Sequence, residues 1–149
     1  MRVSWGFDVH RLGGEPPVRL AGVLVDPARG VVATSDGDLV AHAVADALLG
    51  VAGLGDLGAH FPASDPKWEG ADSMELLGRV AAMCSGIRVT FLDVTVIAQQ
   101  VRVAPHRNAI RDSLAWPSES SPVGSRSRPP PQMVWERSAP ARGSRLPRS

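Results

Sequence analysis

The sequence predicts an α/β domain, an α+β sandwich in which helices cover one face of a mixed β-sheet. Segments with alternating apolar residues and segments with a helical apolar period follow one another along the chain. Hydrophobic residues make up 44% of the 149 residues, which suffices for the core of one domain. Both patterns stop near Ala115, so we expect the domain to span residues 1–115. Residues 116–149, rich in Ser, Pro, Arg and Gly, are expected to form a disordered tail.

Three segments favour β-strands. Residues 2–10, "RVSWGFDVH", alternate in character and contain valine and aromatic residues. Residues 17–26, "PVRLAGVLVD", are the second candidate and run into a turn at "PARG". Residues 87–99, "IRVTFLDVTVIAQ", give the longest strand pattern, so we expect one strand from each segment.

Three further segments favour helices. The first is "SDGDLVAHAVADALLGVAGLGD", with aspartates available as N-caps and glycines at its end. The second covers residues 72–84 and starts with Asp72 or Ser73 as its cap. The third covers residues 104–115, and a loop rich in Pro, Gly and Asp is expected at residues 58–71.

Composition excludes several classes of partner. The net charge of +1 gives no electrostatic reason to bind nucleic acid or an anionic membrane. No apolar run approaches the roughly 18 residues that span a bilayer, and no signal-peptide pattern opens the chain. The one cysteine, Cys84, cannot form an internal disulfide, which favours a cytoplasmic location.

Asp8 and His10 stand at alternate positions of the first strand candidate, so their side chains share one face. His42, in the first turns of the first helix, is a third candidate ligand. Two imidazole nitrogens and one carboxylate make an open site for a divalent metal such as zinc, with a coordination position left for substrate. Asp46, four residues after His42, is a candidate to orient one of the ligands.

The spacing alone leaves other interpretations open. An Asp-x-His pair is a weak motif, and His10 can equally be a polar residue at a strand end. Asp36 and Asp38 are more often helix caps than ligands. The "TSDGD" run adds a second indication, because it brings backbone N–H groups to a helix start, where a phosphate is favoured. An ordinary capped helix is the alternative.

Four longer motifs occur in order: "GFDVHRL", "SDGDLVAHAVADALLG", "GLGDLGAHFPASDPKWEGADS" and "DVTVIAQQVRVAPH". Together they resemble the 2-C-methyl-D-erythritol 2,4-cyclodiphosphate synthase family, from Arg2 to about Ala115. The resemblance implies a homotrimeric lyase of non-mevalonate isoprenoid biosynthesis, with active sites between subunits. In the implied reaction, the 2-phosphate of a cytidine-diphosphate-linked methylerythritol attacks the β-phosphorus and CMP leaves. The implied cofactors are zinc on one phosphate and magnesium or manganese on the diphosphate.

The resemblance also assigns roles by position. Asp8, His10 and His42 would be the zinc ligands. Thr34 stands where the family commonly has a histidine that helps to stabilise the transition state, so Thr34 is the implied catalytic residue, with a donor but no cationic charge. The implied substrate-binding residues are Asp8, His10, Thr34, Ser35, Asp56, Leu57, Gly58, Phe61, Pro62, Ala63, Ser64, Asp65, Gln100, Val101, Arg102, Val103, Ala104, Pro105 and His106.

The family's C-terminal motifs, "TTTE" or "TTTD" followed by "GxGEGIA", do not occur after Ala115. They can nevertheless be obtained from the tail. When residues 126–145, "RSRPPPQMVWERSAPARGSR", are back-translated and read from the third base of each codon, they can give "VKATTTDGLGALGAGEGIAA". We therefore interpret the tail as an out-of-frame translation of the family's C-terminus, with the shift between Ala115 and Gly124. A genuine disordered extension is the alternative.

Three functions compete at this point. The first is the cyclodiphosphate synthase. The second is a metal-binding, catalytically impaired remnant of that enzyme, because the tail lacks the acidic residue expected to hold magnesium and the threonines expected near the phosphates. The third, an unrelated zinc hydrolase, is disfavoured because several motifs stand in register.

Overall fold

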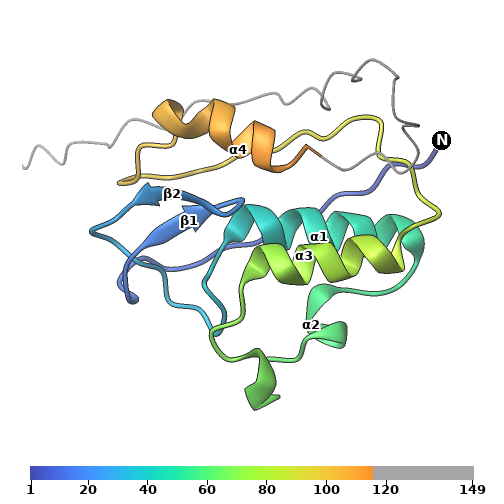
Figure 1. Ribbon diagram of the computed structural model, residues 1–149, viewed down its shortest axis with the longest axis horizontal. Helices are drawn as coiled ribbons and strands as arrows, with labels where there is room; N and C mark the ends of the chain where they lie inside the picture. Colours follow the sequence, from blue (N-terminus) through green and yellow to red (C-terminus); the bar gives the residue numbers. More distant parts are fainter. Residues whose placement is uncertain (116–149) are drawn as a thin grey trace, which may run out of the picture.

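The computed structural model describes residues 1–115, and the tail predicted for residues 116–149 lies outside them. Helices α1 and α3 lie side by side against a short β-hairpin, and α4 covers the other side of the hairpin (Figure 1). None of the helices in this range has the length and apolar character needed to cross a bilayer. The elements are β1 (Val18–Leu20), β2 (Val23–Asp26), α1 (Leu39–Ala52), α2 (Leu57–His60), η1 (Pro66–Trp68), α3 (Ser73–Met83), η2 (Ala104–His106) and α4 (Arg107–Ser113).

The strand predicted over residues 17–26 is instead a hairpin of two strands. Ala21 and Gly22 both have positive φ, 49° and 75°, as a two-residue hairpin turn requires. The strands pair antiparallel, with Leu20 opposite Val23. The prediction missed this turn because Ala21 is apolar and continues the hydrophobic pattern of the strands on either side.

Asp38 fastens this turn to the start of α1. Its side chain is fully buried. Oδ1 accepts hydrogen bonds from the backbone N–H groups of Ala21 at 2.7 Å and Ala41 at 3.0 Å, and Oδ2 accepts one from Gly22 at 2.6 Å. One carboxylate therefore caps the helix, as predicted for this position, and also holds the hairpin.

We expect Asp38→Ala to lower the free energy of unfolding by about 3 kcal/mol, because hydrogen bonds to a charged group are lost and buried N–H groups are left unpaired. Asp38→Asn should cost less, since its amide keeps one acceptor oxygen. Urea unfolding of both variants measures the difference. Equal stability of Asp38→Ala and the parent chain would contradict the dual role of Asp38.

Two other predicted strands, residues 2–10 and 87–99, are not strands in the structure. Among residues 1–115 the sheet consists of β1 and β2, with one isolated bridge between Leu12 and Val31. Both segments still alternate between more buried and exposed side chains. Alternation requires only an extended backbone, whereas a strand also requires a neighbour with which to exchange hydrogen bonds. The predicted mixed sheet is therefore wrong for the described residues, where an antiparallel hairpin stands in its place. The prediction that helices cover one face is also wrong there, because α1 and α4 lie on opposite sides of the hairpin.

The extended N-terminal segment packs closely along α1. A Cβ added to Gly6 would stand 1.9 Å from the carbonyl oxygen of Ala43, so only glycine permits this approach. At the start of the segment, an Arg2 guanidinium nitrogen donates to the carbonyl of Val51 at 3.3 Å. The segment is thus held against the helix that carries His42.

The remaining helices lie near their predicted positions, with one correction. Helix α3 begins after Asp72, whose carboxylate caps it, and η2 with α4 occupies the helix predicted at residues 104–115. The loop predicted at residues 58–71 contains the short helices α2 and η1, which are capped by Asp56 and Asp65. Aspartate and proline are typical of helix starts as well as of loops, which is why composition did not distinguish the two.

Candidate metal centre

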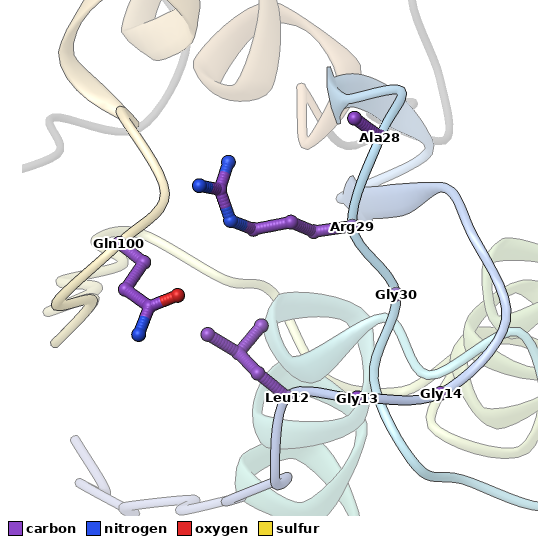
Figure 2. Close-up of a pocket in the computed structure, with 7 residues that line it drawn as sticks. All are labelled: Leu12, Gly13, Gly14, Ala28, Arg29, Gly30 and Gln100. Carbon is purple, nitrogen blue, oxygen red and sulfur yellow. The ribbon is translucent and has the colours of Figure 1, made fainter.

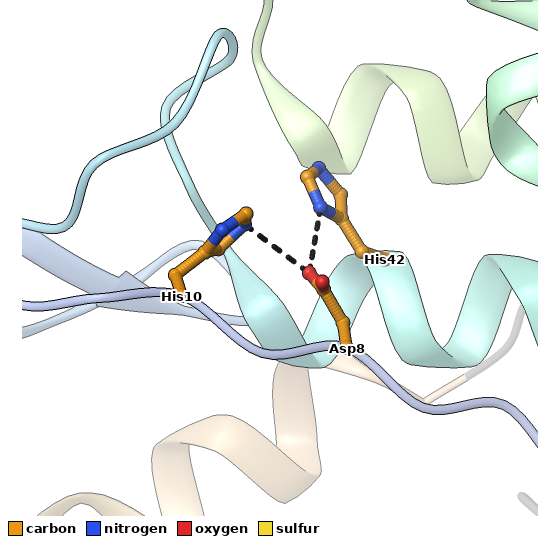
Figure 3. A group of neighbouring side chains, drawn as sticks. All are labelled: Asp8, His10 and His42. Atoms are coloured by element: carbon orange, nitrogen blue, oxygen red, sulfur yellow. Dashed lines mark hydrogen bonds and ion pairs between the residues drawn. The ribbon is translucent and has the colours of Figure 1, made fainter.

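The three predicted ligands converge where the N-terminal segment passes the start of α1 (Figure 3). Asp8 Oδ2 lies 2.9 Å from His42 Nδ1 and 3.2 Å from His10 Nε2. One ligand atom from each residue lies within 4.8 Å of the other two. The side chains are largely shielded, with 20% of Asp8, 18% of His10 and 14% of His42 exposed. The predicted convergence is therefore confirmed, although the segment that carries Asp8 and His10 is not a strand.

The donor set fits a divalent metal. Atoms that share one zinc ion lie roughly 3 to 3.5 Å apart, because each is about 2 Å from the ion. The distances from Asp8 Oδ2 agree with this spacing. His10 Nε2 is buried, and its contact with Asp8 lacks hydrogen-bond geometry, so it has no hydrogen-bond partner among residues 1–115. A metal ion bound here would coordinate this nitrogen and remove the free-energy cost of a buried polar atom without a partner.

Asp8 is held in its charged form. Burial by itself would raise the pKa of Asp8, but the hydrogen bond from His42 and the charges of His10 and His42 together outweigh it. The backbone N–H of Val9, which donates to Oδ1 at 2.8 Å, acts in the same direction. The pKa of Asp8 therefore lies below its ordinary value of 3.8, and the group is a carboxylate at neutral pH, as metal ligation requires.

Two hydroxyls lie behind His42. Its second ring nitrogen, Nε2, is 2.9 Å from Ser73 Oγ and 3.2 Å from Ser35 Oγ. Ser73 Oγ also contacts the carboxylate of Asp36 at very short range. Ser35 was predicted at this site, whereas Ser73 and Asp36 were considered only as helix caps. No local pattern could have linked Ser73 to His42, because 31 positions separate them.

The predicted residues of the α2 region form a second group. Asp56, Leu57 and Gly58 stand at the start of α2, and residues 61–65 lead from α2 to η1. Asp46 joins this region to α1, because its Oδ1 accepts a hydrogen bond from the backbone N–H of Leu57 at 2.7 Å. The role expected for Asp46 is therefore corrected, since it fixes the start of α2 instead of orienting a metal ligand.

Residues 100–106 form a third group. Gln100 lines a cavity of about 410 Å³, into which Arg29 also extends (Figure 2). Val101 and Val103 are buried in the core, so they can offer a ligand only backbone groups. The cavity is also lined by Leu12, Gly13, Gly14, Ala28 and Gly30.

The model of the YgbB family matches residues 1–122. The chain belongs to the YgbB family. The 2-C-methyl-D-erythritol 2,4-cyclodiphosphate synthase of Shewanella halifaxensis is 50% identical over 117 residues, which cover 77% of this chain and 74% of that protein. That of Shewanella loihica is 50% identical over 122 residues, which cover 80% and 76%. A solved structure of a 2C-methyl-D-erythritol-2,4-cyclodiphosphate synthase, in its CDP-bound form, matches with a TM-score of 0.69 and 37% identity, covering 76% of this chain and 77% of that one.

These likenesses confirm the family resemblance that the four motifs indicated. They also confirm the predicted enzyme class. By homology the chain is a cyclodiphosphate synthase, and this enzyme is a lyase. The overall fold is confirmed at the level of the structural match, despite the correction to the sheet. The roles of individual residues stay predictions.

Proposed function

We propose that this YgbB family chain converts 4-diphosphocytidyl-2-C-methyl-D-erythritol 2-phosphate into the cyclic 2,4-diphosphate and CMP. An oxygen of the 2-phosphate forms a bond to the β-phosphorus. The bond from the β-phosphorus to the bridging oxygen breaks, and that oxygen leaves with CMP. The observation that carries the proposal is the convergence of Asp8, His10 and His42 beside the Ser35 hydroxyl, in a chain that is 50% identical to a named synthase over 117 residues.

The proposed roles at the reacting phosphates follow from charge. Asp8, His10 and His42 would hold zinc, which when bound supplies positive charge against a substrate phosphate. Ser35 donates a hydroxyl to the same phosphate, and Thr34 donates where the family commonly has a histidine. The protein needs no nucleophile of its own, because the substrate supplies one, so its task is to hold two mutually repelling phosphates in line. Magnesium or manganese at the diphosphate is the second proposed cofactor.

The remaining roles concern the rest of the substrate. We assign the methylerythritol pocket to Asp56, Leu57 and Gly58, and its cover to residues 61–65. The bond between Asp46 and Leu57 supports this assignment, because it ties the start of α2 to the helix that carries His42. We assign cytidine binding to residues 100–106, supported by the position of Gln100 in a cavity of about 410 Å³.

We also propose that the chain acts as a cytoplasmic homotrimer. Large apolar side chains stand on the outer faces of both extended segments, and an exposed apolar face of this kind favours a protein interface. Trp5 is 80% exposed and stacks on Phe7 with ring centroids 5.6 Å apart. The exposed residues of these faces are Val3, Trp5, Phe7, Val9, Phe91 and Ile97.

A second candidate function is a metal-binding remnant without turnover. The observation that favours it is the extent of the family match, which ends at residue 122 and leaves about a quarter of the relatives' length unmatched. We propose that residues 1–115 form an incomplete synthase domain and that residues 116–149 are the out-of-frame tail. The metal triad lies entirely within the first part.

The experiment that tests the proposal is phosphorus NMR of the substrate incubated with the chain, zinc and magnesium. We expect slow formation of CMP and of the cyclic diphosphate in equal amounts, and none after chelation of the metals. A linear product of hydrolysis would favour an unrelated zinc hydrolase. Zinc binding without any CMP would establish the remnant in place of the synthase.

A further inference from the structure

We propose that Ser73 and Asp36 are positioning residues of the metal site, which together fix the ring nitrogen that His42 presents to Asp8. They form a chain of hydrogen bonds that runs from the carboxylate of Asp36 through the Ser73 hydroxyl to His42 Nε2. The inference rests on the metal site proposed above.

The direction of each hydrogen bond follows from the donors available. Asp36 accepts from the backbone N–H of Ser73 at 3.2 Å and from that of Asp38 at 3.3 Å, and its Oδ1 contacts Ser73 Oγ. A carboxylate only accepts, so the one hydroxyl proton of Ser73 goes to Asp36. The lone pairs of Ser73 Oγ then remain for His42, and Nε2 must be the donor.

This direction determines which nitrogen of His42 is available to a metal. The neutral imidazole of a metal-bound histidine carries one N–H, and Ser73 would hold it on Nε2. Nδ1 is then the ligating nitrogen, and a bound metal ion would replace the hydrogen bond that Nδ1 makes with Asp8 Oδ2 at 2.9 Å. Histidine ligands of metals almost always donate their other N–H to a protein acceptor, which sets both the tautomer and the orientation of the ring.

The position of this chain of hydrogen bonds is itself well fixed. Ser73 is only 1% exposed and is the first residue of α3, which packs against α1. Two backbone hydrogen bonds join the segments on either side: Gly70 N–H donates to the carbonyl of Thr34 at 2.9 Å, and Asp36 N–H donates to that of Ala71 at 3.1 Å. The start of α3 is therefore held at one distance from His42.

Ser35 is the other hydroxyl near His42 Nε2, and its surroundings indicate a different task. Its Oγ already accepts from the backbone N–H of Gly37 at 3.2 Å. Ser35 is half-buried and borders a cavity of about 400 Å³, whereas Ser73 faces only protein. We therefore assign the support of His42 to Ser73, and contact with substrate to Ser35.

The test measures zinc affinity of the full 149-residue chain by competition with a chromogenic chelator, so it needs no turnover. We expect Ser73→Ala to weaken zinc binding about tenfold or more, the range found for residues that orient a metal-bound histidine. Asp36→Asn should weaken it in the same direction. Ser73→Thr keeps the hydroxyl and should return most of the affinity. With Co²⁺ in place of zinc, Ser73→Ala should also shift the visible absorption bands.

The matched control is Asp72→Ala, which removes the N-cap of the same helix but touches neither His42 nor Asp36. We expect it to lower the melting temperature and to leave zinc affinity unchanged. Equal zinc affinity of Ser73→Ala and the parent chain would overturn the inference. So would an equal loss in Asp72→Ala, which would mean that zinc affinity follows only the stability of α3. A parent chain that binds no zinc would instead overturn the metal site, and the inference with it.

Discussion

Asp8→Ala is expected to abolish stoichiometric zinc binding, with affinity lowered by well over 100-fold. The loss of a direct ligand should exceed the 10- to 100-fold cost of losing a group that only orients one. Asp8 has the largest expected effect of the three ligands, because its Oδ2 is the atom that lies nearest both histidines. It is also the only anionic ligand of the triad, so its removal leaves two neutral or cationic rings facing each other. Zinc retained after gel filtration, measured by mass spectrometry, is the readout.

His60→Ala is the matched control for this experiment. The hydrogen bond of His60 lies outside the triad, because its Nε2 bonds to the carbonyl oxygen of Leu54 at 2.8 Å. We expect it to retain one zinc per chain. If the double variant His10→Ala with His42→Ala retained one zinc as well, the assignment of the metal site would be wrong.

The metal triad shows how much of the site the sequence could predict. Asp8 and His10 could be placed on one face because alternate side chains of any extended chain share a face, and this held without a strand. His42 could be added because it lies near the start of a well-capped helix. What the spacing could not show is why the two segments meet, which depends on Gly6 and its approach to the backbone of Ala43.

The fold was less predictable than the site, and for a different reason. The helices α1 and α3 carry local signals, such as the aspartate caps Asp38 and Asp72, and their starts were predicted. Pairing of strands depends on partners distant in the chain, so residues 2–10 and 87–99 looked like strands without forming a ladder. Contacts at long range also explain why Ser73 was identified only as a helix cap.

The sequence after Ala115 should affect catalysis and zinc binding differently. The proposed zinc ligands all lie before residue 43, so we expect the tail to leave zinc binding intact. The resemblance to the family implies an acidic ligand for the second cation, and two or more threonines, beyond Ala115. In that part of the sequence the acidic residues are Glu119 and Glu136. Neither glutamate stands in the "TTTE" or "TTTD" motif. A chain with the alternative reading frame after Ala115 would therefore differ at the proposed diphosphate site and be the same at the proposed zinc site.

Restoring the alternative frame after Ala115, so that the chain ends with "VKATTTDGLGALGAGEGIAA", is expected to raise the rate of CMP release at least 10²- to 10³-fold. In-line attack brings a phosphate toward a diphosphate, and the second cation spreads the negative charge that accumulates. Losing one such electrostatic contact commonly costs 10² to 10³ in rate. The 149-residue chain and the frame-restored chain would be compared in one assay, with saturating zinc and magnesium. Zinc affinity should be the same in both, and comparable turnover would show that the tail is a tolerated replacement for the family's C-terminus.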